Sequence, residues 1–278
     1  MSFDAQAYHD HAASQSNFMA SNTLCKQISW QHSANGLIIV DHDEQTPFIG
    51  VVTGRVSPFN LKCGTSGDYL KKGALEKAKY QLHLVRPTDK ILAHDFDTVI
   101  RNLETMQKAA GTTGDHRNMV IRDMTGEMLH VVANIFEPRN VRIPDSPHGR
   151  RVPNAPLMDE VTDKWPIAPD HEDDFIHIKY THEAVPLPVF QDGKAIQPLE
   201  INHALEGALV EIYLSIHHWH FSGYDSFQAK MEKVIILHPT ASIPGKHHLP
   251  EPTEGEGTEE EPPHKRTEKA GEASGSNV

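Results

Sequence analysis

Cysteine, long hydrophobic runs and glycosylation sites are scarce or missing in this sequence. Its 278 residues contain two cysteines, Cys25 and Cys63, which form no Cys-x-x-Cys pair, and no Asn-x-Ser/Thr site. This pattern favours a reducing intracellular compartment, nuclear or cytoplasmic. No stretch approaches the ~18 apolar residues of a membrane span, so we expect no membrane association. Residues 1–20 lack the basic and apolar regions of a secretory signal, so we expect none.

Catalytic and cofactor motifs are also missing. The sequence contains no GxxxxGK[ST] phosphate loop, no GxGxxG dinucleotide motif and no GxSxG nucleophile elbow. It therefore offers no candidate catalytic residue, and we expect a non-enzymatic protein without a cofactor or metal.

Histidine is the abundant exception, with 20 residues. The densest group is His217, His218 and His220 around Trp219. His218 and His220 share a strand face, and that spacing can bring two imidazoles to one metal. We favour the alternative that one or two of these histidines are buried and hydrogen-bonded and that the others face solvent, so no metal site is assigned.

The formal net charge of −12 is unevenly distributed. Residues 251–278 hold eight acids and three bases, and residues 159–174 hold seven acids and one base. The rest of the chain is close to neutral. The acidic composition therefore does not exclude an anionic partner.

Apolar alternation predicts mainly β structure with one principal helix. Strands are expected over 24–31, 37–40, 47–58, 78–86, 119–122, 128–136, 175–182, 208–221 and 227–238. A bulge is expected near Lys233, where the apolar parity changes, and a hairpin turn at Asp192–Gly193. The single strong helical pattern covers 94–109 and ends at Gly111. Gly50 and Gly54 share one strand face, which indicates a strongly coiled strand or a close backbone approach.

Composition divides the chain into three parts. Residues 1–22 are polar and aperiodic and are predicted to be a disordered arm. Residues 23–240 are expected to form one β-rich domain, interrupted by a proline-rich excursion at 138–174. Residues 241–278 are predicted to be a disordered acidic tail.

Basic and aromatic residues concentrate in two places. The first is the stretch from the 47–58 strand through the following loop and strand, and the second is the closing strand pair. Aromatic rings beside cations on a sheet face suit single-stranded nucleic acid, because bases stack on rings and phosphates meet the cations. The alternative is that the rings pack as a second hydrophobic layer. The candidate residues are Arg55, Lys62, Lys71, Lys72, Lys79, Tyr80, Tyr213, Trp219 and Lys230.

The order of these segments resembles the OB-fold, a five-stranded Greek-key barrel with a helix between its third and fourth strands. The matching segments are PFIGVVTGRV, AKYQLHLVR, DFDTVIRNLETMQ and MLHVVANIF, followed by the closing pair GALVEIYLSIHHWHFSGYDSFQAKMEKVIILHP. An OB-like body with an acidic tail is similar to the single-stranded-DNA-binding proteins of phage replication systems. The whole chain also resembles a family from mushroom-forming fungi to which no activity is assigned.

The phage resemblance implies that a basic groove binds single-stranded DNA. It also implies that the acidic tail competes with DNA and recruits a protein partner, although the phage tails end in an aromatic residue and this one ends in Ser-Gly-Ser-Asn-Val. We expect an elaborated OB-like barrel, with a β-sandwich as the alternative. The leading functional hypothesis is binding of single-stranded nucleic acid, DNA in particular. A capsid-like or scaffold subunit is the second hypothesis, and a metal-dependent enzyme is the third.

Overall fold

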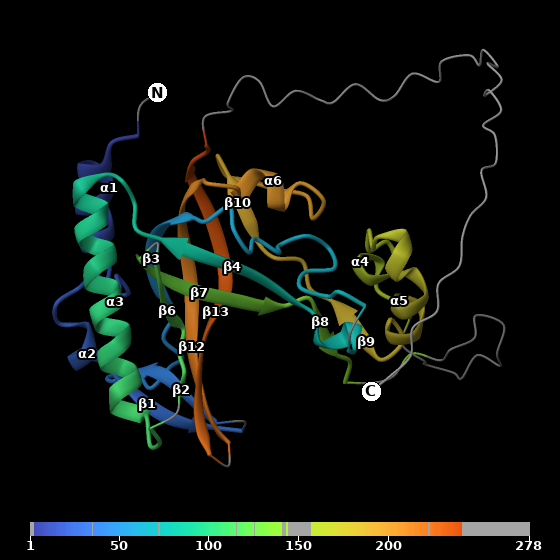
Figure 1. Ribbon diagram of the computed structural model, residues 1–278, viewed down its shortest axis with the longest axis horizontal. Coiled ribbons are helices and arrows are strands. Elements are labelled where there is room, and N and C mark those ends of the chain that lie inside the picture. Colours follow the sequence, from blue (N-terminus) through green and yellow to red (C-terminus); the bar gives the residue numbers. More distant parts are fainter. Residues whose placement is uncertain are drawn as a thin grey trace, which may run out of the picture. The chain divides into compact units, whose positions relative to one another are not determined.

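The computed structural model describes residues 3–34, 36–71, 73–114, 116–124, 126–140, 143, 157–221 and 223–240 (Figure 1). These residues belong to one compact unit that spans residues 1–240. Lys72 and the predicted acidic tail at 241–278 lie outside the described residues.

Within the described part of the chain, five strands close into a ring. They are β3 (Gly50–Val56), β4 (Lys79–Val85), β7 (Gly126–Asn134), β12 (Leu209–Phe221) and β13 (Tyr224–His238). Their order is β3–β4–β7–β13–β12, and β12 pairs with β3 to close the ring. Only the β7–β13 pair of this ring is parallel. A ring whose fifth strand lies between the third and the fourth is an OB-like Greek-key barrel. This confirms the predicted fold class and excludes the two-sheet sandwich.

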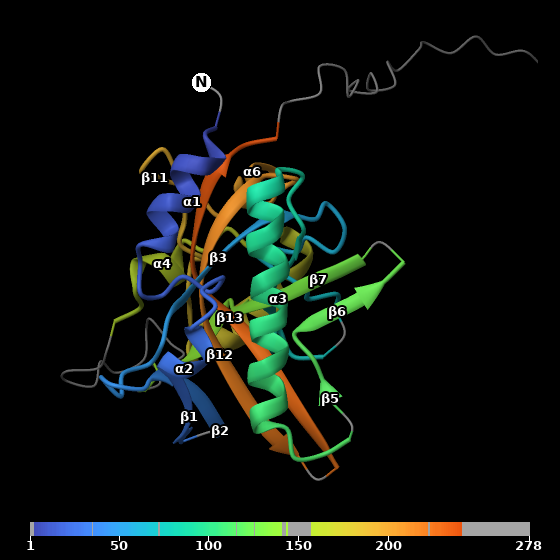
Figure 2. The same ribbon diagram turned by 90° about the vertical axis from the view of Figure 1, so that its left-hand side faces the viewer.

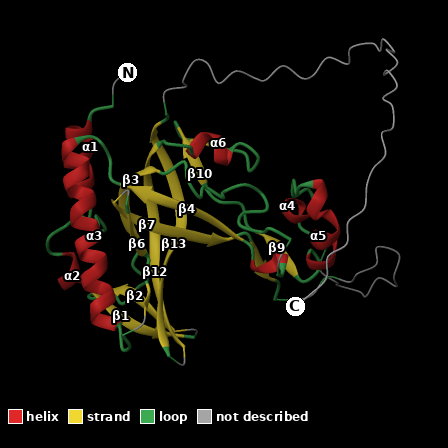
Figure 3. Cartoon of the chain, viewed as in Figure 1, coloured by secondary structure: helices red, strands yellow, loops and turns green. Residues whose placement is uncertain are grey.

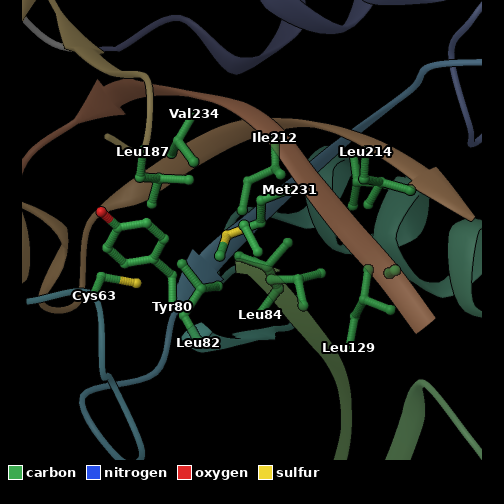
Figure 4. Packing of buried hydrophobic residues seen from close by; sticks show 14 of the residues in the cluster. Cys63, Tyr80, Leu82, Leu84, Leu129, Leu187, Ile212, Leu214, Met231 and Val234 are labelled. Atoms are coloured by element: carbon green, nitrogen blue, oxygen red, sulfur yellow. The ribbon is translucent and has the colours of Figure 1, made fainter. Parts of the chain in front are cut away.

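Alternation along the ring strands sends one set of side chains into the barrel and the other set outwards. Tyr80, Leu82 and Leu84 of β4 point into the core, where Figure 4 shows them among aliphatic residues of the other strands. The two glycines of β3 allow close packing. A Cβ at Gly54 would lie 3.1 Å from the side chain of Leu84, and a Cβ at Gly50 would lie 2.5 Å from Met19 Sδ.

The first two strands stand outside the ring. β1 (Ile28–Ser33) and β2 (Gly36–Asp41) form a hairpin, and β2 pairs with β12 where Leu37 lies opposite His218. The ring therefore begins at β3. As a result, the principal helix falls between the second and third ring strands, not between the third and fourth as expected.

That principal helix is α3 (Lys90–Ala110), which confirms the predicted helix at 94–109. Asp89 caps it by accepting hydrogen bonds from the backbone N–H groups of Ile91 and Leu92. Figure 2 shows α3 lying across the barrel strands. Its apolar stripe, from Phe96 to Met106, packs into the core.

Residues 3–22 are not a disordered arm, which corrects the prediction for the described part of 1–22. They contain α1 (Ala5–Ala13), capped by Asp4. The Tyr8 hydroxyl donates to Glu211 at 2.5 Å and lies 2.7 Å from Thr53 Oγ1. Met19 is completely buried. The segment has few apolar residues, but Ala12, Phe18 and Met19 are buried. Composition alone therefore gave the wrong answer.

The segment between β7 and β12 carries short elements. They are β8 (Phe136–Pro138), α4 (Glu160–Asp163), a 3₁₀ turn at Pro169–His171, α5 (Glu172–Ile178), β9 (His182–Ala184), β10 (Val189–Gln191), β11 (Lys194–Ala195) and α6 (Ile201–Leu205). Figure 3 shows α4 and α5 beside β9. The strand expected at 175–182 is therefore largely helix α5. Similarly, residues 24–27 form the short helix α2 (Leu24–Gln27) ahead of β1.

Other turn signals gave correct predictions. Asp192 and Gly193 both have positive φ and connect β10 to β11. The register of β12 against β13 shifts beside Tyr213 and Lys233, which confirms the predicted bulge. No helix among the described residues is long and apolar enough to cross a membrane.

Candidate nucleic-acid interface

The outer face of β4, β7 and β13 gathers several basic side chains. Alternation places Lys79 and His83 of β4 outside the barrel, because Tyr80, Leu82 and Leu84 point inside. His83 lies opposite His130 of β7, and Lys230 of β13 pairs with Val132 of β7. The strand β5 (His116–Arg117) pairs with β13 and extends this surface. Lys62, in the loop after β3, forms an isolated β-bridge with Gln81. We call the following set the outer basic face: Lys62, Lys79, His83, Arg117, His130, Gln228 and Lys230.

Lys79 links two strands of this face. Its Nζ donates to Gln228 Oε1 of β13 at 3.2 Å, although Lys79 itself belongs to β4. Burial lowers the pKa of Lys79, and the positive charge of Arg117 lowers it further, while Asp68 opposes this change. Lys79 and Arg117 are therefore close enough for their positive charges to repel each other. A surface that holds two positive charges this close together attracts an anion.

The face continues onto the outward side of the β12–β13 hairpin. Gln228 lies opposite His217, and the imidazole of His217 stacks on the indole of Trp219 with ring centroids 5.6 Å apart and an interplanar angle of 12°. Lys79, Gln228, His217 and Trp219 thus form one chain of neighbours. The structure brings together the predicted residues Lys79, Lys230 and Trp219.

The tip of this hairpin carries an aromatic pair. Phe221 and Tyr224 stack at 5.2 Å and are 47% and 43% exposed. They were not among the predicted site residues. The signal was present, since a glycine turn flanked by aromatics at a hairpin tip exposes both rings.

Tyr213 lies further round the barrel, beside Val51 of β3. The ammonium of Lys233 sits 3.6 Å from the centroid of its ring. This cation–π contact occupies one face of the ring. Tyr213 is therefore a flanking residue and not a neighbour of Lys79.

The structure removes Tyr80 from the predicted set. Its side chain is 1% exposed, its hydroxyl donates to the carbonyl of Val185 at 3.2 Å, and Figure 4 shows its ring beside Cys63 and Leu187. The prediction grouped Lys79 with Tyr80, but consecutive residues of a strand face opposite sides. Tyr80 is a core residue and cannot stack on a base.

Two further predicted residues lie apart from the outer basic face. Arg55 pairs with Val85, at the opposite end of β4 from Lys79, and its guanidinium donates to the carbonyl of Gly207 at 2.6 Å. Lys71 is exposed on the loop between β3 and β4, with a positive φ of 56°. Its neighbour Lys72 is outside the described residues.

The histidine cluster is built around Asp225, which is completely buried. His218 Nε2 and His220 Nδ1 lie 2.9 and 3.1 Å from Asp225 Oδ1, and the backbone N–H groups of Thr112 and Thr113 donate to Oδ2. Burial alone would raise the pKa of Asp225, but these hydrogen bonds outweigh it and hold that pKa well below its usual range. Asp225 therefore stays ionised and joins the hairpin to the loop after α3.

The hairpin register places Asp225 directly opposite His220, on the strand face that His218 and His220 were expected to share. His217 faces the other side of β12 and stacks on Trp219. In the described ranges, no group of three or more His, Cys, Asp or Glu side chains is placed to hold a metal ion.

No protein-family model and no curated protein sequence matches the chain. Among solved structures, it is similar to gp2.5, a single-stranded DNA-binding protein encoded by bacteriophage T7, with 12% identity and a TM-score of 0.41 over 72% of this chain and 92% of that one. It is also similar to the single-stranded DNA-binding protein from bacteriophage Enc34, with 10% identity and a TM-score of 0.37 over 78% and 95% of the two chains. The Enc34 protein in complex with single-stranded DNA gives 10% identity and a TM-score of 0.36 over 78% and 99%. Values this low do not establish a common fold, so the OB-like assignment rests on the strand order.

Proposed function

We propose that this protein binds single-stranded nucleic acid, DNA in particular, on the outer basic face and the adjoining side of the β12–β13 hairpin. The single observation that carries the proposal is the continuous row formed by Lys79, Gln228, His217 and Trp219. It places a cation of β4, the second ring strand, beside a stacked aromatic ring of β12, the fourth ring strand. OB-folds bind oligonucleotides with the face of strands 2 and 3 and with the loops between strands 1 and 2 and between strands 4 and 5. Here β4 is the second strand, and the tip of the β12–β13 hairpin is the connection between the fourth and fifth.

Each part of the surface has a definite role in this proposal. Lys62, Lys79, Arg117 and Lys230 contact phosphates through charge. Trp219 and the exposed pair at the hairpin tip provide platforms on which successive bases stack. Lys71 and Arg55 lie apart from this face, and Tyr213 flanks it. Lys72 is outside the described residues and stays a prediction. The fungal resemblance adds no activity to this proposal and stays a prediction.

The acidic residues at 241–278 enter the proposal as a competitor. A segment of net negative charge tethered to the same chain is present at high effective concentration and can occupy a basic face in place of nucleic acid. The same segment is proposed to recruit a protein partner when nucleic acid displaces it. Deleting residues 251–278 is therefore expected to tighten binding.

Fluorescence anisotropy with a labelled single strand of about 30 nucleotides tests the proposal. Binding is expected to weaken steeply with salt, because log K falls with log salt by about 0.7 for each neutralised phosphate. A triple variant, Lys62→Gln/Arg117→Gln/Lys230→Gln, is expected to reduce that slope by about 2 and to weaken binding at low salt.

The matched control removes three charges elsewhere. Lys26, Lys90 and Lys108 are exposed on α2 and α3, and their triple change to Gln is expected to leave the salt slope almost unchanged. Absence of binding at low salt, even after deletion of residues 251–278, would refute the proposed function. Equal losses in both triple variants would refute the location of the interface.

A further inference from the structure

Two histidines occupy the middle of the outer basic face. His83 of β4 and His130 of β7 lie directly opposite each other, and His83 Nε2 is 3.1 Å from His130 Nδ1. Their rings meet edge to face with centroids 5.1 Å apart. His83 is 6% exposed, whereas His130 is partly exposed to solvent. The contact with His83 engages Nδ1 of His130 and leaves its Nε2 as the nitrogen that can gain a proton.

We propose that His83 and His130 form a phosphate subsite that takes up one proton when a nucleic-acid phosphate binds, so that binding is coupled to protonation. This inference rests on the proposed function and deepens it, because it assigns a chemical role to residues that the charge pattern alone does not identify. In the bound state, His130 donates from Nε2 to a phosphate oxygen and from Nδ1 to His83 Nε2. His83 remains neutral with its own proton on Nδ1.

The proton balance of this step is simple. In the free protein, both imidazoles are neutral and share one hydrogen bond. When the phosphate binds, one proton passes from solvent to His130 and no bond between heavy atoms is made or broken. The phosphate supplies the negative charge that makes this uptake favourable.

The charged groups around the pair come from several elements. They are Lys62 and Asp68 from the β3–β4 loop, Lys79 from β4, Arg117 from β5, and Asp123 from β6 (Val120–Asp123). Burial lowers the pKa of His130 to about 4, the coupling to His83 and the positive charges of Arg117 and Lys79 lower it further, and Asp68 opposes this. Burial also lowers the pKa of His83, where Asp123 opposes the change and Lys62 reinforces it.

A bound anion opposes this lowering of the pKa. Burial is the largest reason that His130 is neutral in the free protein, and Arg117 and Lys79, which add to it, also attract a phosphate. Once a phosphate oxygen lies beside His130, its negative charge stabilises the imidazolium and compensates the neighbouring cations, so the pKa of His130 rises toward its ordinary range. Affinity is then expected to increase as pH falls, by up to tenfold per pH unit for one coupled proton.

Calorimetry on the full-length chain measures this coupling without a variant. Binding of a thymidine oligonucleotide is titrated near pH 6 in buffers of different ionisation enthalpy, and the dependence of the observed enthalpy on the buffer gives the number of protons taken up. Thymine carries no basic ring nitrogen, so the nucleic acid contributes no proton of its own. An uptake approaching one proton is expected.

Two variants locate the proton. His130→Gln is expected to abolish the uptake while retaining binding through the lysines, whereas His42→Gln, which alters an exposed histidine at the β2–β3 turn, is expected to retain it. Binding without proton uptake by the unmodified protein would overturn the inference and leave the proposed function intact. Uptake that persists in His130→Gln would overturn the assignment to this pair. No binding at any pH would overturn the proposed function and this inference together.

Discussion

Asp225 shows how one buried residue supports the whole hairpin. Its carboxylate accepts hydrogen bonds from two backbone N–H groups after α3 and faces His218 and His220. Replacing a buried, ionised group that accepts from several donors strongly destabilises the fold, because all of these donors lose their acceptor at once. The residue therefore fixes the position of the strands that carry Trp219.

Asp225→Asn is expected to lower the free energy of unfolding by about 3 kcal/mol. The amide keeps the size of the side chain but cannot accept from all of the surrounding donors. Urea unfolding at neutral pH measures the effect. A loss below about 0.5 kcal/mol would contradict the structural role assigned to Asp225.

Trp219→Ala is expected to weaken binding of single-stranded DNA by about 5- to 100-fold, because one stacking platform is lost. Trp219→Phe retains a ring and is expected to recover most of the affinity. Anisotropy at fixed salt compares the three proteins. Equal affinity of the alanine variant and the unmodified protein would exclude Trp219 from the interface.

At the scale of single residues, sequence alone identified cations but not their neighbours. Lys79 and Lys230 could be selected because basic and aromatic residues concentrate in the two stretches that contain them. The opposite fates of Lys79 and Tyr80 follow from strand alternation once the inward face is known. The pairing of His83 with His130 could not be predicted, since it depends on the register between β4 and β7, which are separated by the whole of α3.

At the scale of elements, α1 is part of the barrel's outer packing. It docks through Tyr8, whose hydroxyl contacts Thr53 of β3 and Glu211 of β12. Burial raises the pKa of Tyr8, and the hydrogen bond to Glu211 raises it further. The helix therefore ties two adjacent ring strands together.

Tyr8→Phe is expected to destabilise the fold by about 1–2 kcal/mol, because Glu211 is 7% exposed and loses its donor. Tyr224→Phe, at the exposed hairpin tip, serves as the matched control and is expected to change stability little. Thermal and urea unfolding of both variants provide the comparison. Equal stabilities would indicate that α1 does not depend on this contact.

Helix α3 and the long strands could be predicted because each has a strong periodic pattern over many residues. The short elements were harder. Phe175 and Ile176 resemble the start of a strand, yet they lie in α5, where the buried Phe175 packs into the core. Such short segments take their structure from tertiary packing, which outweighs local propensity.

At the scale of the whole molecule, ring closure depends on contacts that no local pattern contains. β12 must meet β3 across more than half of the chain, and β7 must run parallel to β13. The composition did indicate that acidity is concentrated in two segments. It could not show that the cations would converge on one side of the barrel, because that follows from the closed strand order.

The depressed histidine pKa values make the folded state sensitive to acid. A histidine in the unfolded chain titrates near 6.5, whereas burial lowers the pKa of His130 to about 4 in the folded state. The unfolded chain therefore binds more protons between these values, and the free energy of unfolding is expected to fall as pH decreases through this window. His130→Gln is expected to flatten the decline. Urea titrations across the window measure it, and stability that rises toward acid pH would contradict the assignment.

The central claim is that single-stranded DNA binds to the outer basic face and the adjoining hairpin. Hydrogen–deuterium exchange with and without a single-stranded oligonucleotide tests it most directly. The predicted result is slower exchange in β4, β7 and the β12–β13 hairpin, with little change in α1, α2 and α3. Protection confined to the helices, or unchanged exchange under conditions where the oligonucleotide is bound, would contradict the claim.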